Sequence, residues 1–169
     1  MLEIGCGCLS AGVALIAYLD AGNYVGIEPN TWLLDAARTS RRTRWLLARK
    51  RATFLARTDF DASGLGRRFD YVLAHSILSH CAHWQLEQFV ANVARVLRPS
   101  GRVVASIRLA DADSRHDEWQ YPGVSWFSLA TVEETAARHG LRVRVEPSYT
   151  ERLVARRPHE IHDWLVFSS

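Results

Sequence analysis

The sequence has no hydrophobic run that approaches the about 20 residues a helix needs to cross a bilayer. No positively charged segment precedes an apolar stretch near its start, so a secretory signal is not predicted. Cysteine is scarce: there are three, an odd number, and Cys6 and Cys8 lie in one turn, which argues against a disulfide framework. We therefore expect a cytoplasmic protein with no membrane partner.

Internal repeats, low-complexity tracts and Pro/Gly/Ser-rich linkers are also missing, so we predict a single domain over residues 1–169. Lysine is nearly absent as well, because Lys50 is the only one and arginine supplies the other basic side chains. The net charge of +3 and the pI of about 9.0 permit an acidic partner without requiring one.

Apolar segments of strand length alternate with segments of helical spacing along the chain. The predicted strands cover residues 1–4, 24–28, 52–57, 69–78, 102–109, 141–147 and 162–169. The predicted helices cover residues 11–20, 31–40, 83–97 and 129–140. Their predicted N-caps are Ser10, Asn30, and either Ser128 or Thr131 with Glu134.

This alternation predicts an α/β fold, a doubly wound and mostly parallel sheet with helices on both faces. Between the last two strands the sequence indicates only a polar loop, so we expect the last strand to be antiparallel. The arginine-rich stretch 41–51 is ambiguous, and "RPSG" at 98–101 is expected to end the third predicted helix.

Polar and glycine residues follow the first two predicted strands, at the edge where such sheets bind ligands. Gly5-Cys6-Gly7 allows a sharp turn and close approach of a ligand to the backbone, and a helix N-terminus follows it. Glu28 ends the second strand, where a carboxylate can accept hydrogen bonds from both ribose hydroxyls. The two features together predict an adenosine-type ligand across these strands.

The glycine pattern does not match a dinucleotide site. The fingerprint G-x-G-x-x-G needs a glycine at the position of Ser10, and the next glycine is Gly12. Glu3 instead lies two residues before the first glycine, where a carboxylate favours an ammonium group over a pyrophosphate. An NAD(P)-dependent oxidoreductase is therefore a less favoured interpretation.

Five segments in order, "LEIGCG", "YVGIEPN", "TDFD", "FDYVLAHSILSH" and "RVLRPSGRVVASI", resemble the motifs of class I S-adenosylmethionine-dependent methyltransferases. The order and spacing of the segments match across about the first 110 residues. It implies a Rossmann-like seven-stranded sheet, S-adenosyl-L-methionine as cofactor, and methyl transfer to an acceptor that we expect to be a small molecule. A non-catalytic cofactor-binding or scaffold subunit of a methyltransferase complex is the alternative.

The resemblance also implies roles for single residues. The methionine part of the cofactor is assigned to Glu3, Gly5, Cys6 and Gly7. The ribose is assigned to Glu28, and the adenine to Ile27, Pro29, Asp59 and Phe60, with Asp61 as the alternative to Asp59. The amino group of the cofactor is expected to meet the backbone of Ala74 and His75.

Two histidines are candidates for the base that an oxygen acceptor needs, since imidazole titrates near neutral pH. His80 is expected near the methyl sulfur, and His75 is the second candidate. The loop 110–127 follows a strand at the same edge, and its predicted substrate contacts are His116, Trp119, Tyr121 and Trp126.

For two further clusters of side chains we predict no binding site. His75, His80, Cys81 and His83 lie in one segment and lack a second pair of ligands, so no metal is predicted. The arginine run from Arg38 to Arg51, which includes Trp45, favours a solvated helix face over contact with nucleic acid.

The sequence departs from the family pattern at two points. Leu9 stands where many members have a third glycine. Members usually carry one or two helices before the first strand, whereas this sequence starts inside that strand and is N-terminally short. We therefore expect either a truncated reading, or a second copy or another chain that covers the N-terminal face.

Overall fold

The computed structural model describes residues 1–41, 43–154 and 162–169. These residues form one seven-stranded sheet in the order β3-β2-β1-β4-β5-β7-β6. The strands are β1 (Leu2–Ile4), β2 (Val25–Ile27), β3 (Thr53–Leu55), β4 (Phe69–Ala74), β5 (Leu97–Ile107), β6 (Arg142–Val145) and β7 (Asp163–Ser168). Pairing from β3 to β5 is parallel, and β7 pairs antiparallel with β5 and β6. The predicted doubly wound sheet with an antiparallel last strand is confirmed.

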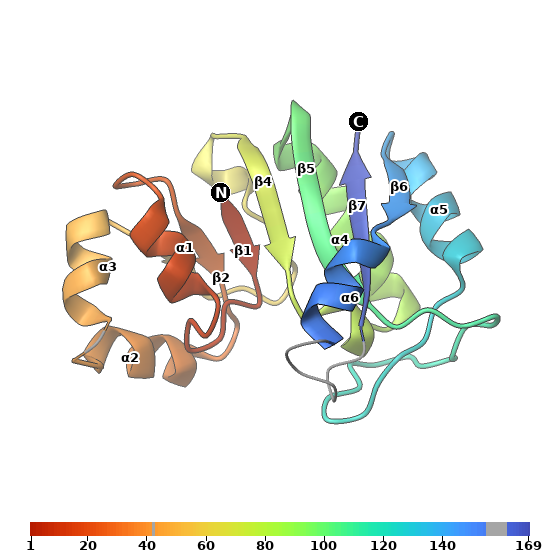
Figure 1. The fold of residues 1–169 in the computed structure, drawn as a ribbon, viewed down its shortest axis with the longest axis horizontal. Helices are drawn as coiled ribbons and strands as arrows, with labels where there is room; N and C mark the ends of the chain where they lie inside the picture. The colour runs from red at the N-terminus through yellow and green to blue at the C-terminus, as the bar shows by residue number, and fades with distance from the viewer. Residues whose placement is uncertain (42, 155–161) are drawn as a thin grey trace.

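Helices lie on both faces of the sheet, with α1 and α6 in front of it and α4 behind it in Figure 1. The helices are α1 (Gly12–Tyr18), α2 (Thr31–Thr39), α3 (Arg44–Lys50), α4 (His83–Val96), α5 (Leu129–Arg138) and α6 (Pro147–Val154). Two short 3-10 turns are η1 (Ser63–Leu65) and η2 (Leu78–His80). No described helix has the length and apolar character that crossing a bilayer requires.

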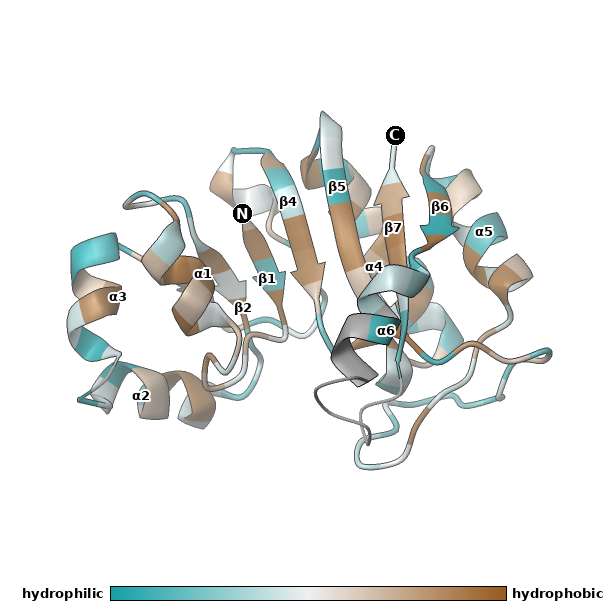
Figure 2. Cartoon of the chain, in the orientation of Figure 1, coloured by the Kyte–Doolittle hydropathy of each residue, from teal (hydrophilic) through white to brown (hydrophobic). Residues whose placement is uncertain are grey.

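Apolar residues of the strands and of α4 and α5 form the main core. Figure 2 shows the hydrophobic colour concentrated in the central strands. The buried core residues of α4 and α5 are Leu86, Phe89, Val90, Val93, Val96, Val132 and Ala136. A second cluster joins the first turn to α1, α2 and α3, and its buried members are Cys6, Leu9, Ile16, Tyr24, Leu34, Ala37 and Leu47. The second cluster therefore packs the glycine turn against α1, α2 and α3 through Cys6 and Leu9.

A groove of about 480 Å³ lies between α1 and the start of β4. Two large side chains beside it are exposed, Tyr18 by 88% and Tyr71 by 56%. The described residues therefore leave part of this face of the sheet uncovered. That a second copy or another chain covers it stays a prediction.

The structure corrects several predicted boundaries. The predicted strand 69–78 ends at Ala74, because Ser76 has a left-handed φ of +55° and η2 follows. The segment "RPSG" follows the end of α4 as predicted, since the C-cap of that helix is Leu97. The same segment also lies within β5, as an irregularity between Leu97, which pairs with Phe69, and Arg102, which pairs with Tyr71. The C-terminal polar loop begins with α6, and residues 155–161 lie outside the described residues.

The predicted helix caps have mixed outcomes. Ser10 is not the N-cap of α1, whose N-cap is Ala11. Asn30 precedes α2 as predicted, but its side chain makes no capping hydrogen bond. Ser128 is the cap of α5, since its hydroxyl accepts the N–H of Thr131 at 3.2 Å.

Candidate functional site

The turn between β1 and α1 needs glycine at two positions for two different reasons. Gly5 and Gly7 have φ of +68° and +51°. A Cβ on Gly5 would lie 2.0 Å from Cδ1 of Ile77, whereas a Cβ on Gly7 would meet no atom within 4 Å. The N–H groups of Gly5 and Cys6 donate to the carbonyl of Ile27, at 2.8 and 3.1 Å. The turn is thus tied to β2 and leaves open space beside Gly7.

Glu28 connects this turn to the end of β2 and is only 5% exposed. Its Oε2 accepts the N–H of Gly7 at 2.9 Å, and its Oε1 accepts the backbone and side-chain N–H groups of Asn30, both at 2.9 Å. A carboxylate offers about four lone-pair sites, so one acceptor site remains, on Oε2. Binding of both ribose hydroxyls therefore requires the Asn30 amide to turn away, a role that the sequence did not reveal.

Glu3 lies beneath α1, with an exposed fraction of 4%. Its carboxyl group accepts the hydroxyl of Tyr24, and Oε2 would lie 2.8 Å from a Cβ on Gly12. Burial raises the pKa of Glu3 to about 7, although the Tyr24 hydrogen bond opposes this effect. Contact between Glu3 and an ammonium group of the cofactor stays a prediction.

The thiol of Cys6 packs below the turn, where it would lie 2.7 Å from a Cβ on Gly26. Burial raises the pKa of Cys6 to about 12, with the charges of Glu3 and Glu28 adding to the effect. Cys6 is therefore a neutral packing residue at physiological pH, and its backbone is the part that shapes the turn.

Asp59 follows β3 at the same edge of the sheet. Arg57 binds both of its oxygens, with Nε at 2.8 Å and NH2 at 2.5 Å, and this contact lowers the pKa of Asp59 to about 2. Its competitor Asp61 accepts the N–H of Ser63 at 2.8 Å. Both carboxylates already have partners, so the choice between them at the adenine stays open.

The apolar residues predicted at the adenine lie mostly in the core. The ring of Phe60 packs edge-on against Phe89, with centroids 5.8 Å apart, and is 8% exposed. The side chain of Ile27 is buried in the same cluster, while Pro29 is exposed. The structure therefore does not bring the three side chains together around one open space.

His75 follows the buried Ala74 at the end of β4 and meets residues from the start of β7. Its ring stacks on that of Trp164, with centroids 5.4 Å apart and planes 8° apart. The ring of His162 lies 5.8 Å from that of His75, and its Nε2 is 3.2 Å from the Ser76 hydroxyl. Sequence reasoning assigned no role to Trp164 or Ser76, because no local signal links β4 to β7.

His80 is held by the loop 110–127. Its Nδ1 donates to the carbonyl of Gly123 at 2.7 Å, so in the neutral ring Nε2 carries the lone pair. The rings of Trp119 and Tyr121 lie 5.6 and 5.3 Å from the His80 ring. The N–H of Gln120 donates to the His80 carbonyl at 2.8 Å. The loop is thus docked on η2, with two of the four predicted substrate residues beside His80.

The other two predicted substrate residues lie elsewhere on the loop. Trp126 is 39% exposed, and the Arg108 guanidinium lies 5.6 Å from the centre of its ring. His116 has no described contact with the His80 cluster. His83 faces Asp113 at 3.2 Å. Among the described residues, no group of three or more histidine, cysteine or acidic side chains could hold a metal ion.

Comparisons with known proteins bear on the family and the fold of the chain. A model of the methyltransferase-domain family matches residues 2–103. Magnesium protoporphyrin IX methyltransferase from Synechocystis PCC 6803, solved with bound SAM, superposes with a TM-score of 0.66 at 16% identity, over 99% of this chain and 69% of that chain. Among curated proteins, none matches the sequence.

Two further solved structures show how widely the fold is used. A TehB-like SAM-dependent methyltransferase from Corynebacterium glutamicum has a TM-score of 0.66 at 19% identity, over 99% of this chain and 78% of that chain. The [4+2]-cyclase SpnF has a TM-score of 0.67 at 15% identity, over 98% of this chain and 72% of that chain. The family model spans more than half of the sequence, and the chain belongs to the methyltransferase-domain family, the class I S-adenosylmethionine-dependent methyltransferases that its motifs predicted.

Proposed function

We propose that this chain transfers a methyl group from S-adenosylmethionine to a small-molecule acceptor. The observation that carries the proposal is the open space beside Gly7, bounded by the backbone of the turn and by the Glu28 carboxylate that holds it. The residues present fit the cofactor here, because a Cβ on Gly7 would enter that space and Glu28 keeps one acceptor site for a hydroxyl.

The protein's main contribution is to position two reactants. When bound, the cofactor supplies a methyl group activated by a positively charged sulfur. Glu28 would hold the ribose, and the bare backbone at Gly7 would admit the rest of the cofactor. Holding two reactants in line can lower the activation free energy by roughly 7–11 kcal/mol.

His80 is the base in this proposal when the acceptor is a hydroxyl. Its Nδ1 is occupied by the Gly123 carbonyl, so Nε2 is the atom that would take the acceptor's proton. Trp119 and Tyr121 flank the ring and would give the acceptor an aromatic contact surface. Both rings are partly exposed, Trp119 by 40% and Tyr121 by 72%, so an acceptor can reach them from solvent.

The experiment incubates the purified chain with S-adenosylmethionine and pooled small molecules, and measures S-adenosylhomocysteine. We expect acceptor-dependent product that Glu28→Ala lowers about 10- to 150-fold, the range for loss of a charged hydrogen bond worth about 1.5–3 kcal/mol. Glu133→Ala, which removes an exposed acid of α5, is the matched control and should keep full activity.

Two results would contradict methyl transfer. Tight cofactor binding with no product from any acceptor would favour the scaffold alternative. Conversion of a substrate without S-adenosylhomocysteine would indicate another reaction on the same fold.

A further inference from the structure

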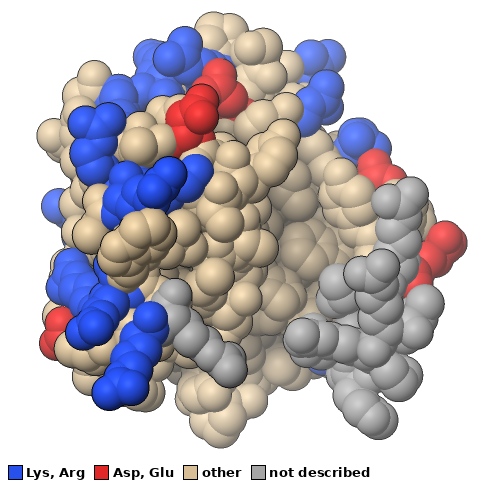
Figure 3. Space-filling model, turned by 60° about the vertical axis from the view of Figure 1, so that its left-hand side comes forward, with Lys and Arg blue, Asp and Glu red and all other residues tan. Residues whose placement is uncertain are grey.

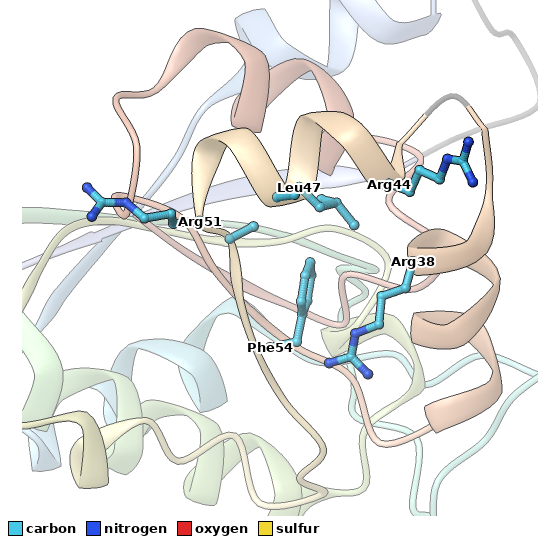
Figure 4. Close-up of a pocket in the computed structure, with 7 residues that line it drawn as sticks. Arg38, Arg44, Leu47, Arg51 and Phe54 are labelled. Atoms are coloured by element: carbon cyan, nitrogen blue, oxygen red, sulfur yellow. The ribbon is translucent and has the colours of Figure 1, made fainter.

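A second groove, of about 360 Å³, lies between α2, α3 and β3, and shares no lining residue with the site above. Figure 4 shows Leu47 and Phe54 pointing toward one another across it, with Arg51 at one end and Arg44 and Arg38 toward the other. The groove thus has an apolar middle and a basic rim.

The positive charge at this groove is not neutralised locally. The sequence contains no acidic residue between Asp35 and Asp59. Arg44 and Arg51 are exposed and form no ion pair with a described residue, and Arg38 has only a 3.5 Å contact with the exposed Asp35. Figure 3 shows Lys and Arg side chains gathered along this side of the molecule. Such a surface attracts an anionic partner.

The spacing of the arginines indicates a partner with repeated charges. Arg44 is the first residue of α3 and Arg51 is its C-cap, so the length of the helix, about 10 Å at 1.5 Å per residue, separates their backbones. Figure 4 shows the two side chains at opposite ends of the groove. A single phosphate or carboxylate cannot contact both. A strand of regularly spaced anions can contact both, with Arg38 on the opposite side of the groove.

Aromatic rings accompany these charges. The Arg38 guanidinium lies 5.5 Å from the centre of the Phe54 ring, and the Arg49 guanidinium lies 5.3 Å from that of the neighbouring Trp45, which is 67% exposed. Flat guanidinium and aromatic surfaces stack on bases, and guanidinium binds phosphate with two hydrogen bonds. An acidic peptide offers matching charge but no bases to stack.

We propose that this groove binds single-stranded nucleic acid, with phosphates at Arg38, Arg44 and Arg51 and a base stacked beside Phe54. The stacking requires an unpaired base, which is why a single strand fits and a duplex does not. The sequence alone favoured a solvated helix face. The groove between the two helices and β3, which no sequence pattern shows, is the reason for the new inference, and it does not depend on the methyl acceptor.

The first test measures fluorescence anisotropy of labelled oligo(U) and oligo(dT), each of about twelve nucleotides, with the full chain at several salt concentrations. We expect binding to at least one oligonucleotide, and at least tenfold weaker binding by the double variant Arg44→Glu/Arg51→Glu. In the double variant, the slope of the logarithm of the binding constant against the logarithm of the salt concentration should be smaller in magnitude than in the wild type by about 1.4. This corresponds to about 0.7 for each of the two lost phosphate contacts.

The matched control is Arg102→Glu/Arg142→Glu, which changes the charge equally at exposed positions of β5 and β6. It should bind within about twofold of the wild type, and thermal melting should show that both double variants are folded. No binding by the wild type, or equal losses in the two double variants, would overturn the proposal.

The second test separates bases from charge. Phe54→Leu keeps an apolar side chain but removes the ring, so it should weaken binding of oligo(U) and leave an abasic strand of equal length unaffected. If Phe54→Leu weakened binding of oligo(U) and of the abasic strand equally, the proposal that a base stacks beside Phe54 would be overturned. Equally tight binding of a duplex, or full displacement of oligo(U) by polyglutamate of equal charge, would overturn single-stranded nucleic acid as the partner.

Discussion

At the residue scale, two buried carboxyl groups flank the glycine turn in different ways. Glu28 accepts three N–H groups and links β1 to the start of α2. Glu3 accepts the Tyr24 hydroxyl beneath α1, and burial raises its pKa to about 7. The first carboxylate therefore organises the turn, while the charge of the second is unfavourable in the folded state.

The raised pKa of Glu3 makes stability depend on pH. The pKa of Glu3 is raised from its ordinary value of 4.5, which applies to the unfolded chain, to about 7 in the folded chain. Between these two pH values the folded state therefore binds the Glu3 proton more tightly than the unfolded state does. We expect the free energy of unfolding to fall as pH rises from about 5 to about 8, by up to about 3 kcal/mol. Urea unfolding at about pH 5 and at about pH 8 measures this change in the free energy of unfolding.

Glu3→Gln is the control for this prediction, because it keeps the shape of the side chain and removes its titration. The variant should lose most of the pH dependence of the unfolding free energy over that range. Identical pH dependence in the variant and the wild type would show that other groups cause it.

Leu9 combines backbone strain with burial. Its φ is +70° and its side chain is 1% exposed in the second core cluster. Leu9→Gly relieves about 1–2 kcal/mol of strain but loses about 2–5 kcal/mol of packing. We expect a net loss of about 2 kcal/mol in urea unfolding, and a glycine variant more stable than the wild type would refute this balance.

At the element scale, the loop 110–127 is ordered by its contacts with η2. The N–H groups of Gln120 and Ser125 donate to the carbonyls of His80 and Ser79, at 2.8 and 2.7 Å, and the His80 ring donates to Gly123. The long polar loop for which the sequence predicted substrate contacts is therefore docked on η2, beside His80.

This docking predicts a specific protease sensitivity. His80→Ala removes the bond to Gly123, worth about 1 kcal/mol, and should raise the rate of tryptic cleavage at the exposed Arg115 roughly fivefold. His80→Gln keeps a side-chain N–H donor and should cleave close to the wild-type rate. Equal cleavage of all three proteins would mean that His80 does not hold the loop.

Elements with strong local patterns could be predicted from the sequence, and those decided by distant pairing could not. The apolar spacing of Leu86, Phe89 and Val93 predicted α4 within one residue at its C-terminal end. Pro99 and Gly101 predicted the end of α4, which the structure confirms, but they did not predict that the same segment belongs to β5. Leu97 and Arg102 pair with Phe69 and Tyr71 of β4 on either side of the segment, and this distant pairing leaves no local pattern in the sequence.

At the scale of the whole molecule, strand order brings distant residues to one edge. β1 pairs with both β2 and β4, so the turn at Gly5–Gly7, the carboxylate of Glu28 and the ring of His75 follow three neighbouring strands. The parallel-sheet rule predicted this edge from the sequence. The burial of Glu3 under α1 and the arginine groove beside β3 could not be predicted, because both depend on how layers pack.

Calorimetry with S-adenosylhomocysteine tests most directly the proposed binding of the cofactor beside Gly7. Gly66→Val is the matched control for Gly7→Val, since Gly66 has a similar φ of +61° and a Cβ there also meets no atom within 4 Å. We predict that the wild type and Gly66→Val bind with similar affinity, while Gly7→Val binds at least tenfold more weakly. Equal affinity of Gly7→Val and the wild type would contradict the account.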